Sequence, residues 1–162
     1  MNDFLNPTHP RKVLVFGCGY LGIRVAQASL QRGDEVFATT RTEDRATQLE
    51  SLGFHALRVD WNDRRTLEAL PTVDRVLIAV AHDPQSRVDR YDSQVGGLKR
   101  LLDQIDLATR VCYISTTGVY HQTDGSWVDE NSAARANRPG GKAHLMAEAM
   151  LRRMRARSSD TV

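Results

Sequence analysis

Three glycines with the spacing GxGxxG constrain the fold of this chain more than any other feature. The motif consists of Gly17, Cys18, Gly19, Tyr20, Leu21 and Gly22; it directly follows an apolar run at 13–16 and opens an amphipathic stretch. At a strand-to-helix turn, the first glycine permits the tight turn, the second lets the backbone approach a pyrophosphate, and the third lets helix and strand pack closely. The N–H groups at the start of the helix then face the phosphates. This context predicts a dinucleotide site, and the alternative is a glycine-rich turn that only connects a strand to a helix.

Short apolar runs alternate with longer amphipathic stretches along the rest of the chain. We expect strands at 13–16, 35–39, 54–59, 75–81 and 110–115, and helices at 20–31, 43–52, 63–70, 86–107 and 142–157. Apolar strands that alternate with helices predict a mostly parallel sheet with helices on both faces. Right-handed crossovers then favour a doubly wound, Rossmann-like α/β fold. We expect a flexible lead-in at 1–11 and one domain at 12–162.

Composition excludes several other classes of protein. The chain has 162 residues, 41% hydrophobic and 26% charged, with a net charge of +2, which gives no indication of a nucleic-acid partner. No apolar run approaches the roughly 20 residues that cross a bilayer, and the polar start lacks the apolar core of a signal peptide. Cys18 and Cys112 form no metal-binding spacing, so no metal is expected. These features predict a cytoplasmic protein without a membrane partner.

The end of the second expected strand indicates which dinucleotide the site prefers. It carries Thr39, Thr40 and Arg41, with no carboxylate before Glu43. An acidic residue at this place would bond the ribose 2′-OH of NAD, whereas an arginine accommodates the 2′-phosphate of NADP. A guanidinium and hydroxyls suit a phosphate better than a diol. We therefore expect NADP, with NAD as the alternative; Arg41 could instead be only a surface residue near the next helix.

Four further segments follow the later strands: VDWND at 59–63, IAVA at 78–81, YISTTGVY at 113–120 and WVDE at 127–130. Together with the glycine motif, they make residues 13–151 resemble the short-chain dehydrogenase/reductase superfamily. The resemblance is to its extended branch of nucleotide-sugar epimerases and dehydratases, especially the atypical members. It implies that Asp60 bonds the adenine amino group, with Trp61 in the same stretch. It also implies that Ala79, Val80 and Ala81 lie along the cofactor ribose.

The same resemblance implies a catalytic hydroxyl after the fifth strand. Counted back from Tyr120, Thr116 falls where the family places its catalytic serine or threonine, and Ser115 and Thr117 are the alternatives. In the family this hydroxyl hydrogen-bonds the reacting oxygen of the substrate. Against this stands a simpler reading, in which the hydroxyls at this strand end only satisfy nearby backbone groups.

The chain departs from the family pattern where a tyrosine and a lysine are expected. The flanking acidic residues align so that Gly140 takes the place of the proton-donating tyrosine and His144 that of the lysine. Glycine has no proton to give, and Lys142 is two residues out of register. His144 could titrate as an acid–base group, but we expect it to be an exposed helix residue. Thr117 and Gly118 replace the acidic pair of the dehydratases, which disfavours sugar dehydration.

Three functions remain open at this stage. The first is an atypical NAD(P)-dependent oxidoreductase or epimerase-like enzyme acting on an unidentified carbonyl or nucleotide-sugar-like small molecule. The second is a non-catalytic NADP(H)-binding sensor or scaffold. The third is an inactive, truncated remnant, since Val162 stands where a further strand should begin and the family's substrate-binding part would follow. The resemblance also leaves a homodimer open.

Overall fold

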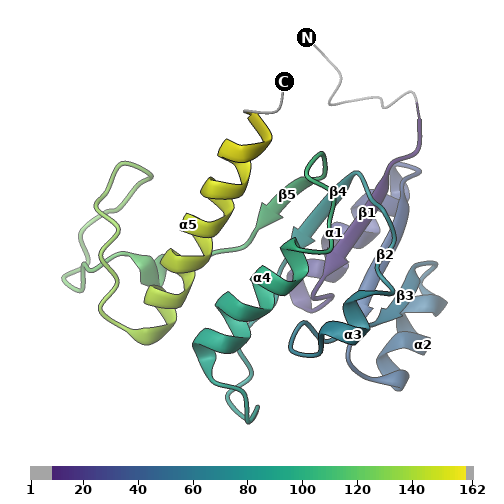
Figure 1. Cartoon of the computed structure of the whole chain (residues 1–162), viewed down its shortest axis with the longest axis horizontal. Coiled ribbons are helices and arrows are strands. Elements are labelled where there is room, and N and C mark those ends of the chain that lie inside the picture. Colours follow the sequence, from purple (N-terminus) through teal and green to yellow (C-terminus); the bar gives the residue numbers. More distant parts are fainter. Residues whose placement is uncertain (1–8, 160–162) are drawn as a thin grey trace.

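The computed structural model describes residues 9–159 and consists of a parallel sheet with helices on both faces (Figure 1). The strands are β1 (Lys12–Phe16), β2 (Glu35–Thr40), β3 (His55–Arg58), β4 (Arg75–Ile78) and β5 (Arg110–Tyr113). They form one sheet in the order β3-β2-β1-β4-β5, and every neighbouring pair is parallel. The predicted Rossmann-like α/β fold is therefore confirmed. The predicted lead-in lies largely outside the described residues, as do Thr161 and Val162.

The helices follow the strands in the expected alternation. They are α1 (Tyr20–Gln31), α2 (Glu43–Ser51), α3 (Arg64–Leu67), α4 (Gly97–Leu102) and α5 (Pro139–Ser159). A π-helical turn, η1 (Asp92–Gly96), directly precedes α4, and a short 3₁₀ helix, η2 (Thr117–Val119), follows β5. The strand order reverses direction between β1 and β4, which is where folds of this kind bind ligands at the carboxyl ends of the strands.

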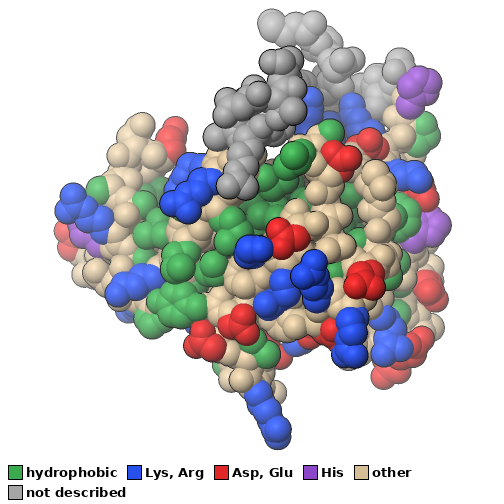
Figure 2. Space-filling view, in the orientation of Figure 1, with side chains coloured by type: hydrophobic (Ala, Val, Ile, Leu, Met, Phe, Trp, Pro, Cys, Tyr) green, Lys and Arg blue, Asp and Glu red, His purple; other side chains and the backbone are tan. Residues whose placement is uncertain are grey.

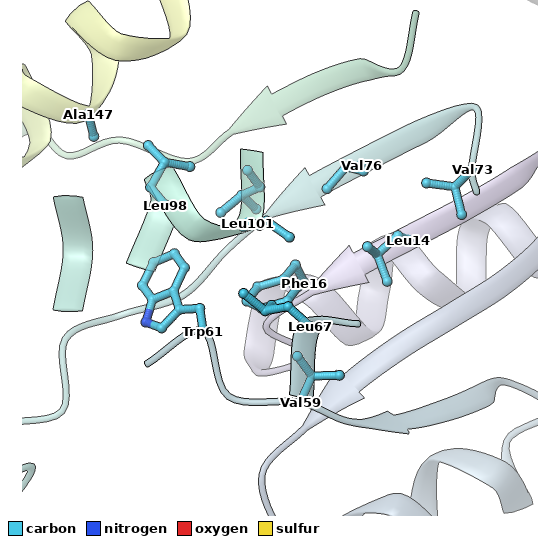
Figure 3. Close-up of a cluster of buried hydrophobic side chains, with 11 residues drawn as sticks. Leu14, Phe16, Val59, Trp61, Leu67, Val73, Val76, Leu98, Leu101 and Ala147 are labelled. Carbon is cyan, nitrogen blue, oxygen red and sulfur yellow. The ribbon is translucent and has the colours of Figure 1, made fainter. Parts of the chain in front are cut away.

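Successive side chains of β1 enter two different cores, because neighbouring residues of a strand point to opposite faces. Val13 and Val15 pack on the face covered by α1 and α2, in a cluster that includes Ala26 and Leu49. The other face carries a second cluster, formed by side chains of β1, of β4, of the segment after β3 and of the helices α3, α4 and α5: Leu14, Phe16, Val59, Trp61, Leu67, Val76, Leu98 and Ala147. Figure 3 shows this second core, with Trp61 between Phe16 and Leu98.

Two helix predictions were wrong in length. The helix expected at 86–107 is replaced by a loop, η1 and the six residues of α4. The Asp89 carboxylate accepts hydrogen bonds from the N–H groups of Tyr91 (2.8 Å) and Asp92 (3.3 Å), so helical structure begins only after it. The helix expected at 63–70 is only the four residues of α3, opened by an Asp63 side chain that accepts from Arg65 N–H at 3.1 Å.

Other boundaries moved by a few residues. The strands expected at 54–59, 75–81 and 110–115 end at Arg58, Ile78 and Tyr113, respectively. The last helix starts at Pro139 rather than at 142, because a proline at the first helical position loses no hydrogen bond. β5 lies at one edge of the sheet, and a hollow of about 700 Å³ separates it from α5. Figure 2 shows apolar side chains gathered along α5 on this face, among interspersed Lys/Arg and Asp/Glu.

Candidate cofactor-binding site

A cavity of about 400 Å³ opens at the carboxyl ends of the central strands. Eleven of the predicted cofactor-binding residues line it: Gly17, Cys18, Gly19, Tyr20, Thr40, Arg41, Asp60, Trp61, Ala79, Val80 and Ala81. Thr39, named with Thr40 and Arg41 in the sequence, also lines it, and sequence reasoning gave no role to four other polar residues of the lining: Asn62, Asp83, Ser86 and Ser93. Leu21 and Gly22, also predicted to bind cofactor, are not part of the described lining. The structure thus brings four segments, far apart in sequence, around one hollow.

The three glycines of the turn have the geometry that the motif predicts. Gly17 has φ +95°, and a Cβ added there would lie 2.6 Å from the carbonyl oxygen of Ala79, so a side chain is excluded. A Cβ at Gly22 would collide with the carbonyl of Gly17, which explains how α1 packs so closely on β1. A Cβ at Gly19 would meet no described atom within 4 Å, so the backbone there is open to the cavity.

Thr39, near the end of β2, holds this turn in place. The N–H of Gly17 donates to Thr39 Oγ1 at 2.9 Å, and the N–H of Cys18 donates to the Thr39 carbonyl at 3.4 Å. Arg45 donates to the Cys18 carbonyl at 3.3 Å. Burial raises the pKa of the Cys18 thiol, although Arg45 partly opposes this shift, so the thiol stays protonated near neutral pH. The turn is therefore a rigid backbone cradle.

The start of α1 is left available to a ligand. Within the described residues, no side chain caps it and its first turn contains no acidic residue. The first N–H groups of a helix have no partner within the helix, and the helix dipole makes this end positive. An uncapped helix start beside an open glycine backbone is the arrangement that suits a diphosphate.

Arg41 lies at the mouth of the cavity, immediately after β2. Its Nη2 forms an ion pair with Asp83 Oδ2 at 3.0 Å, and both side chains are partly exposed. Asp83 belongs to the loop after β4 and also accepts a hydrogen bond from Gln85 N–H at 3.0 Å. Mainly through the Arg41 hydrogen bond, the pKa of the Asp83 carboxyl is lowered from its ordinary value. Arg41 is thus a cavity residue, and its charge is already paired.

Asp60, Trp61 and Asn62 form the wall where the adenine was predicted. Asp60 Oδ1 accepts from Asn62 N–H at 2.9 Å, and Asn62 Oδ1 is buried without a hydrogen-bond partner in the described part of the chain. Trp61 is mainly a core residue: it is 3% exposed and packs against Phe16 with ring centroids 5.9 Å apart (Figure 3). Trp61 therefore lines the cavity while most of its side chain packs in the core.

The predicted catalytic hydroxyls lie away from this cavity lining. Thr116 Oγ1 accepts from Gly118 N–H at 3.1 Å and so caps η2. Ser115 Oγ donates to Glu148 Oε1 of α5 at 2.5 Å. Of the residues the structure describes, neither these two nor Thr117 lines the cavity. The structure thus does not bring the predicted catalytic hydroxyls and the cofactor residues into one cavity.

The expectation that His144 is exposed was wrong. It is half-buried between β5 and η1: a hydrogen bond of 2.8 Å joins its Nδ1 to Tyr113 OH, and one of 3.2 Å joins its Nε2 to Gln94 Nε2. Burial lowers the pKa of His144, against the opposing effect of Glu148. Burial, with Glu148, raises the pKa of Tyr113 to about 12. We call Gln94, His144 and Tyr113 the histidine network.

Sequence reasoning missed Gln94 and Tyr113 because the network joins three elements distant in sequence. Gln94 is 2% exposed, and its Oε1 has no hydrogen-bond partner among the described residues. Gly140, at the place of the family's tyrosine, has the Arg90 guanidinium beside it: an added Cβ would lie 3.5 Å from Nη1. Lys142 is exposed, as its position out of register suggests.

A parallel sheet in this order, with a glycine cradle at its switch point, defines a dinucleotide-binding α/β domain. Residues 13–162 match the family described as the NAD dependent epimerase/dehydratase family, and the chain belongs to it. The match supports a nicotinamide dinucleotide as the cofactor. No curated protein sequence matches the chain significantly.

Solved structures show the same fold. The UDP-Glc/GlcNAc 4-epimerase of Campylobacter jejuni is 20% identical with a TM-score of 0.78, and the match covers 91% of this chain and 50% of that one. A UDP-glucose 4-epimerase of Thermus thermophilus, solved with NAD, is 18% identical with a TM-score of 0.71, covering 91% and 52%. A functionally unknown protein of Silicibacter pomeroyi is 26% identical with a TM-score of 0.63, covering 89% and 49%. The chain thus spans about half the length of these structures.

Residues 9–159 contain neither a candidate membrane-spanning helix nor a candidate metal cluster. None of the helices found there is both long and apolar enough to cross a membrane. No cluster of three or more His, Cys, Asp or Glu side chains in the same residues has the arrangement to hold a metal ion.

Proposed function

We propose that this domain binds a nicotinamide dinucleotide in the cavity at the β1–α1 turn, with NADP(H) preferred over NAD(H). The observation that carries the proposal is the rigid glycine cradle beside the uncapped start of α1. Gly19 and the first N–H groups of α1 would hold the pyrophosphate. Asp60, which lines the cavity, would accept a hydrogen bond from the adenine amino group. Thr40 and Arg41 would hold the 2′-phosphate.

Binding can be measured through tryptophan fluorescence. Of the two tryptophans, Trp61 lines the cavity and Trp127 is fully exposed. A Trp127→Phe variant therefore reports on the cavity alone.

In this variant, NADPH should change the Trp61 emission, and adding Arg41→Ala should weaken NADPH binding about tenfold because a charge-assisted contact to phosphate is lost. NADH affinity should stay within about twofold. Arg58→Ala is the matched control, because Arg58 is paired with Glu43 outside the lining. A preference for NADH that ignores Arg41→Ala would contradict the NADP assignment.

For the chemistry, we propose an epimerase-like oxidoreductase acting on a carbonyl or nucleotide-sugar-like substrate. The cofactor supplies hydride acceptance and donation. Thr116 is favoured over Ser115 as the hydroxyl that hydrogen-bonds a substrate oxygen. The Ser115 hydroxyl already donates a hydrogen bond to Glu148. The Thr116 hydroxyl only accepts one, from Gly118 N–H, so its O–H can still donate a hydrogen bond to a substrate.

One observation favours the second candidate, a non-catalytic NADP(H)-binding sensor or scaffold. A glycine, Gly140, stands where the family has its proton-donating tyrosine. The nearby Tyr113 hydroxyl is hydrogen-bonded to His144, and the pKa of Tyr113 is raised to about 12, which makes this phenol a weak acid. Incubating the NADPH-bound protein with a panel of carbonyl compounds and nucleotide sugars, while nicotinamide absorbance is followed, separates the two. Tight binding without turnover supports the sensor; an inactive remnant would bind neither dinucleotide. Cytoplasmic location and a homodimer remain predictions.

A further inference from the structure

Asp83 lies where it can compete with a cofactor phosphate. It lines the same cavity as Arg41 but comes from the opposite side of the switch point, in the loop after β4. Its Oδ2 lies 3.0 Å from Arg41 Nη2, while its Oδ1 is held by Gln85 N–H, also at 3.0 Å. The carboxylate is thus held by its own loop, and it pairs with the guanidinium of another residue of the cavity lining.

The charge balance at this mouth decides what Arg41 can offer to a ligand. A 2′-phosphate carries about −1.5 to −2 charges near neutral pH. To reach the guanidinium, it must displace or share the Asp83 carboxylate, and two anions close together repel each other. A ribose 2′-OH imposes no such competition, because it can donate to a carboxylate. The lowered pKa of Asp83 supports this, since the group stays ionised at neutral pH.

We propose that Asp83 is a specificity-determining residue that competes with the cofactor 2′-phosphate for Arg41 and thereby narrows the preference for NADPH over NADH. This inference rests on the proposed dinucleotide function. Arg41 favours the phosphorylated cofactor and Asp83 favours the unphosphorylated one. The selectivity of the site is therefore set by a pair of residues, of which the second strand supplies only one.

The test compares Asp83→Asn with the unchanged chain, each titrated with NADPH and NADH by calorimetry. Asparagine keeps an oxygen that can accept from Gln85 N–H, so the loop turn is retained while the charge is removed. NADPH should bind about fivefold more tightly to the variant, in line with the release of one exposed ion pair, and NADH equally well or more weakly. Asp83→Ser provides a second route if the asparagine variant folds poorly, and thermal unfolding monitors both.

Two controls make the result specific. Asp89→Asn removes the same charge from the same loop, at a residue that accepts from Tyr91 N–H and lies outside the described cavity lining, so the ratio of the two affinities should not change. In an Arg41→Ala background, Asp83→Asn should improve NADPH binding by less than about twofold, because there is no guanidinium to release.

The outcomes separate this inference from the proposed function. If the unchanged chain binds neither dinucleotide, both fail. If it binds them and Asp83→Asn leaves the NADPH-to-NADH ratio unchanged, only the role of Asp83 fails. An equally large gain in the Arg41→Ala background would also overturn competition for Arg41. A gain confined to chains that retain Arg41 supports it.

Discussion

The two sites at the carboxyl edge of the sheet differ in how their polar groups are used. At the β1–α1 turn, backbone is left open: Gly19 faces empty space and α1 has no side-chain cap among the described residues. At and after β5, two of the polar side chains are hydrogen-bonded to side chains of α5: Ser115 to Glu148 and Tyr113 to His144. Open donors suit a ligand, whereas internally bonded side chains suit a stable fold. The β1–α1 turn therefore leaves backbone donors available to a ligand, whereas the region after β5 uses most of its polar side chains within the fold.

The largest effect should come from closing the glycine cradle. Gly17→Ala places a Cβ 2.6 Å from a backbone carbonyl at φ +95°, so we expect a loss of about 3 kcal/mol in the free energy of unfolding and no dinucleotide binding. Gly125→Ala is the control: its φ is +82°, but a Cβ would meet no described atom within 4 Å. It should cost only about 1 kcal/mol of strain. Equal losses by urea unfolding would show that the Ala79 carbonyl does not shape the cradle.

Trp61 joins the two regions, which makes the packing against it the next prediction. A Cβ at Gly97 would lie 2.7 Å from the Trp61 ring, so Gly97→Ala should destabilise the fold by about 2 kcal/mol and shift the Trp61 emission. At Gly96, a Cβ would lie 2.7 Å from Asp92 Oδ1, the end of an exposed side chain that can move away. Gly96→Ala should therefore be neutral or stabilising by up to about 1 kcal/mol. Chemical denaturation of the two variants checks this difference.

Local patterns predicted the first region well and the second poorly, for a physical reason. The glycine motif works through adjacent backbone atoms, so its spacing, together with the strand and helix patterns on either side, predicted the tight turn correctly. Thr39 and Asp83 contact their partners across 22 and 42 residues of sequence, respectively, and no periodicity shows such contacts. His144 was assigned to solvent because a helix pattern does not reveal that Tyr113 and Gln94 lie beside it.

Trp61 shows a further limit of the family resemblance. Its place in a motif predicted a ligand contact, and Trp61 does line the cavity, but the motif did not show that most of its surface packs in the core against Phe16 (Figure 3). The helix expected at 86–107 was too long because the amphipathic pattern continued through Asp89, whose carboxylate caps the following N–H groups. In both cases, a tertiary or side-chain contact outweighed the local signal.

A smaller effect should distinguish the cap function of Thr116 from a catalytic one. Thr116→Ala removes the oxygen that accepts from Gly118 N–H and should cost about 1 kcal/mol of stability. Thr116→Ser keeps the hydroxyl and should restore most of it. If Thr116 also hydrogen-bonds a substrate, turnover should fall in the alanine variant and recover in the serine variant. Unchanged turnover in Thr116→Ala would show that this hydroxyl only caps η2.

The smallest predicted effect isolates the histidine network by its pH dependence. Because burial lowers the folded-state pKa of His144, the unfolded chain takes up this proton first as the pH falls. Stability should therefore be full well above the ordinary histidine pKa of about 6.5 and decrease over the pH range below that value. Urea unfolding across this range should show a shallower decrease for His144→Gln, whereas His121→Gln, at an exposed loop residue, should keep the original slope. NADPH affinity at the upper end of this range should be the same in both variants, because neither residue lines the described cavity. Identical slopes would show that His144 does not set this pH dependence, and a large loss of NADPH affinity in His144→Gln alone would show that the two regions are coupled.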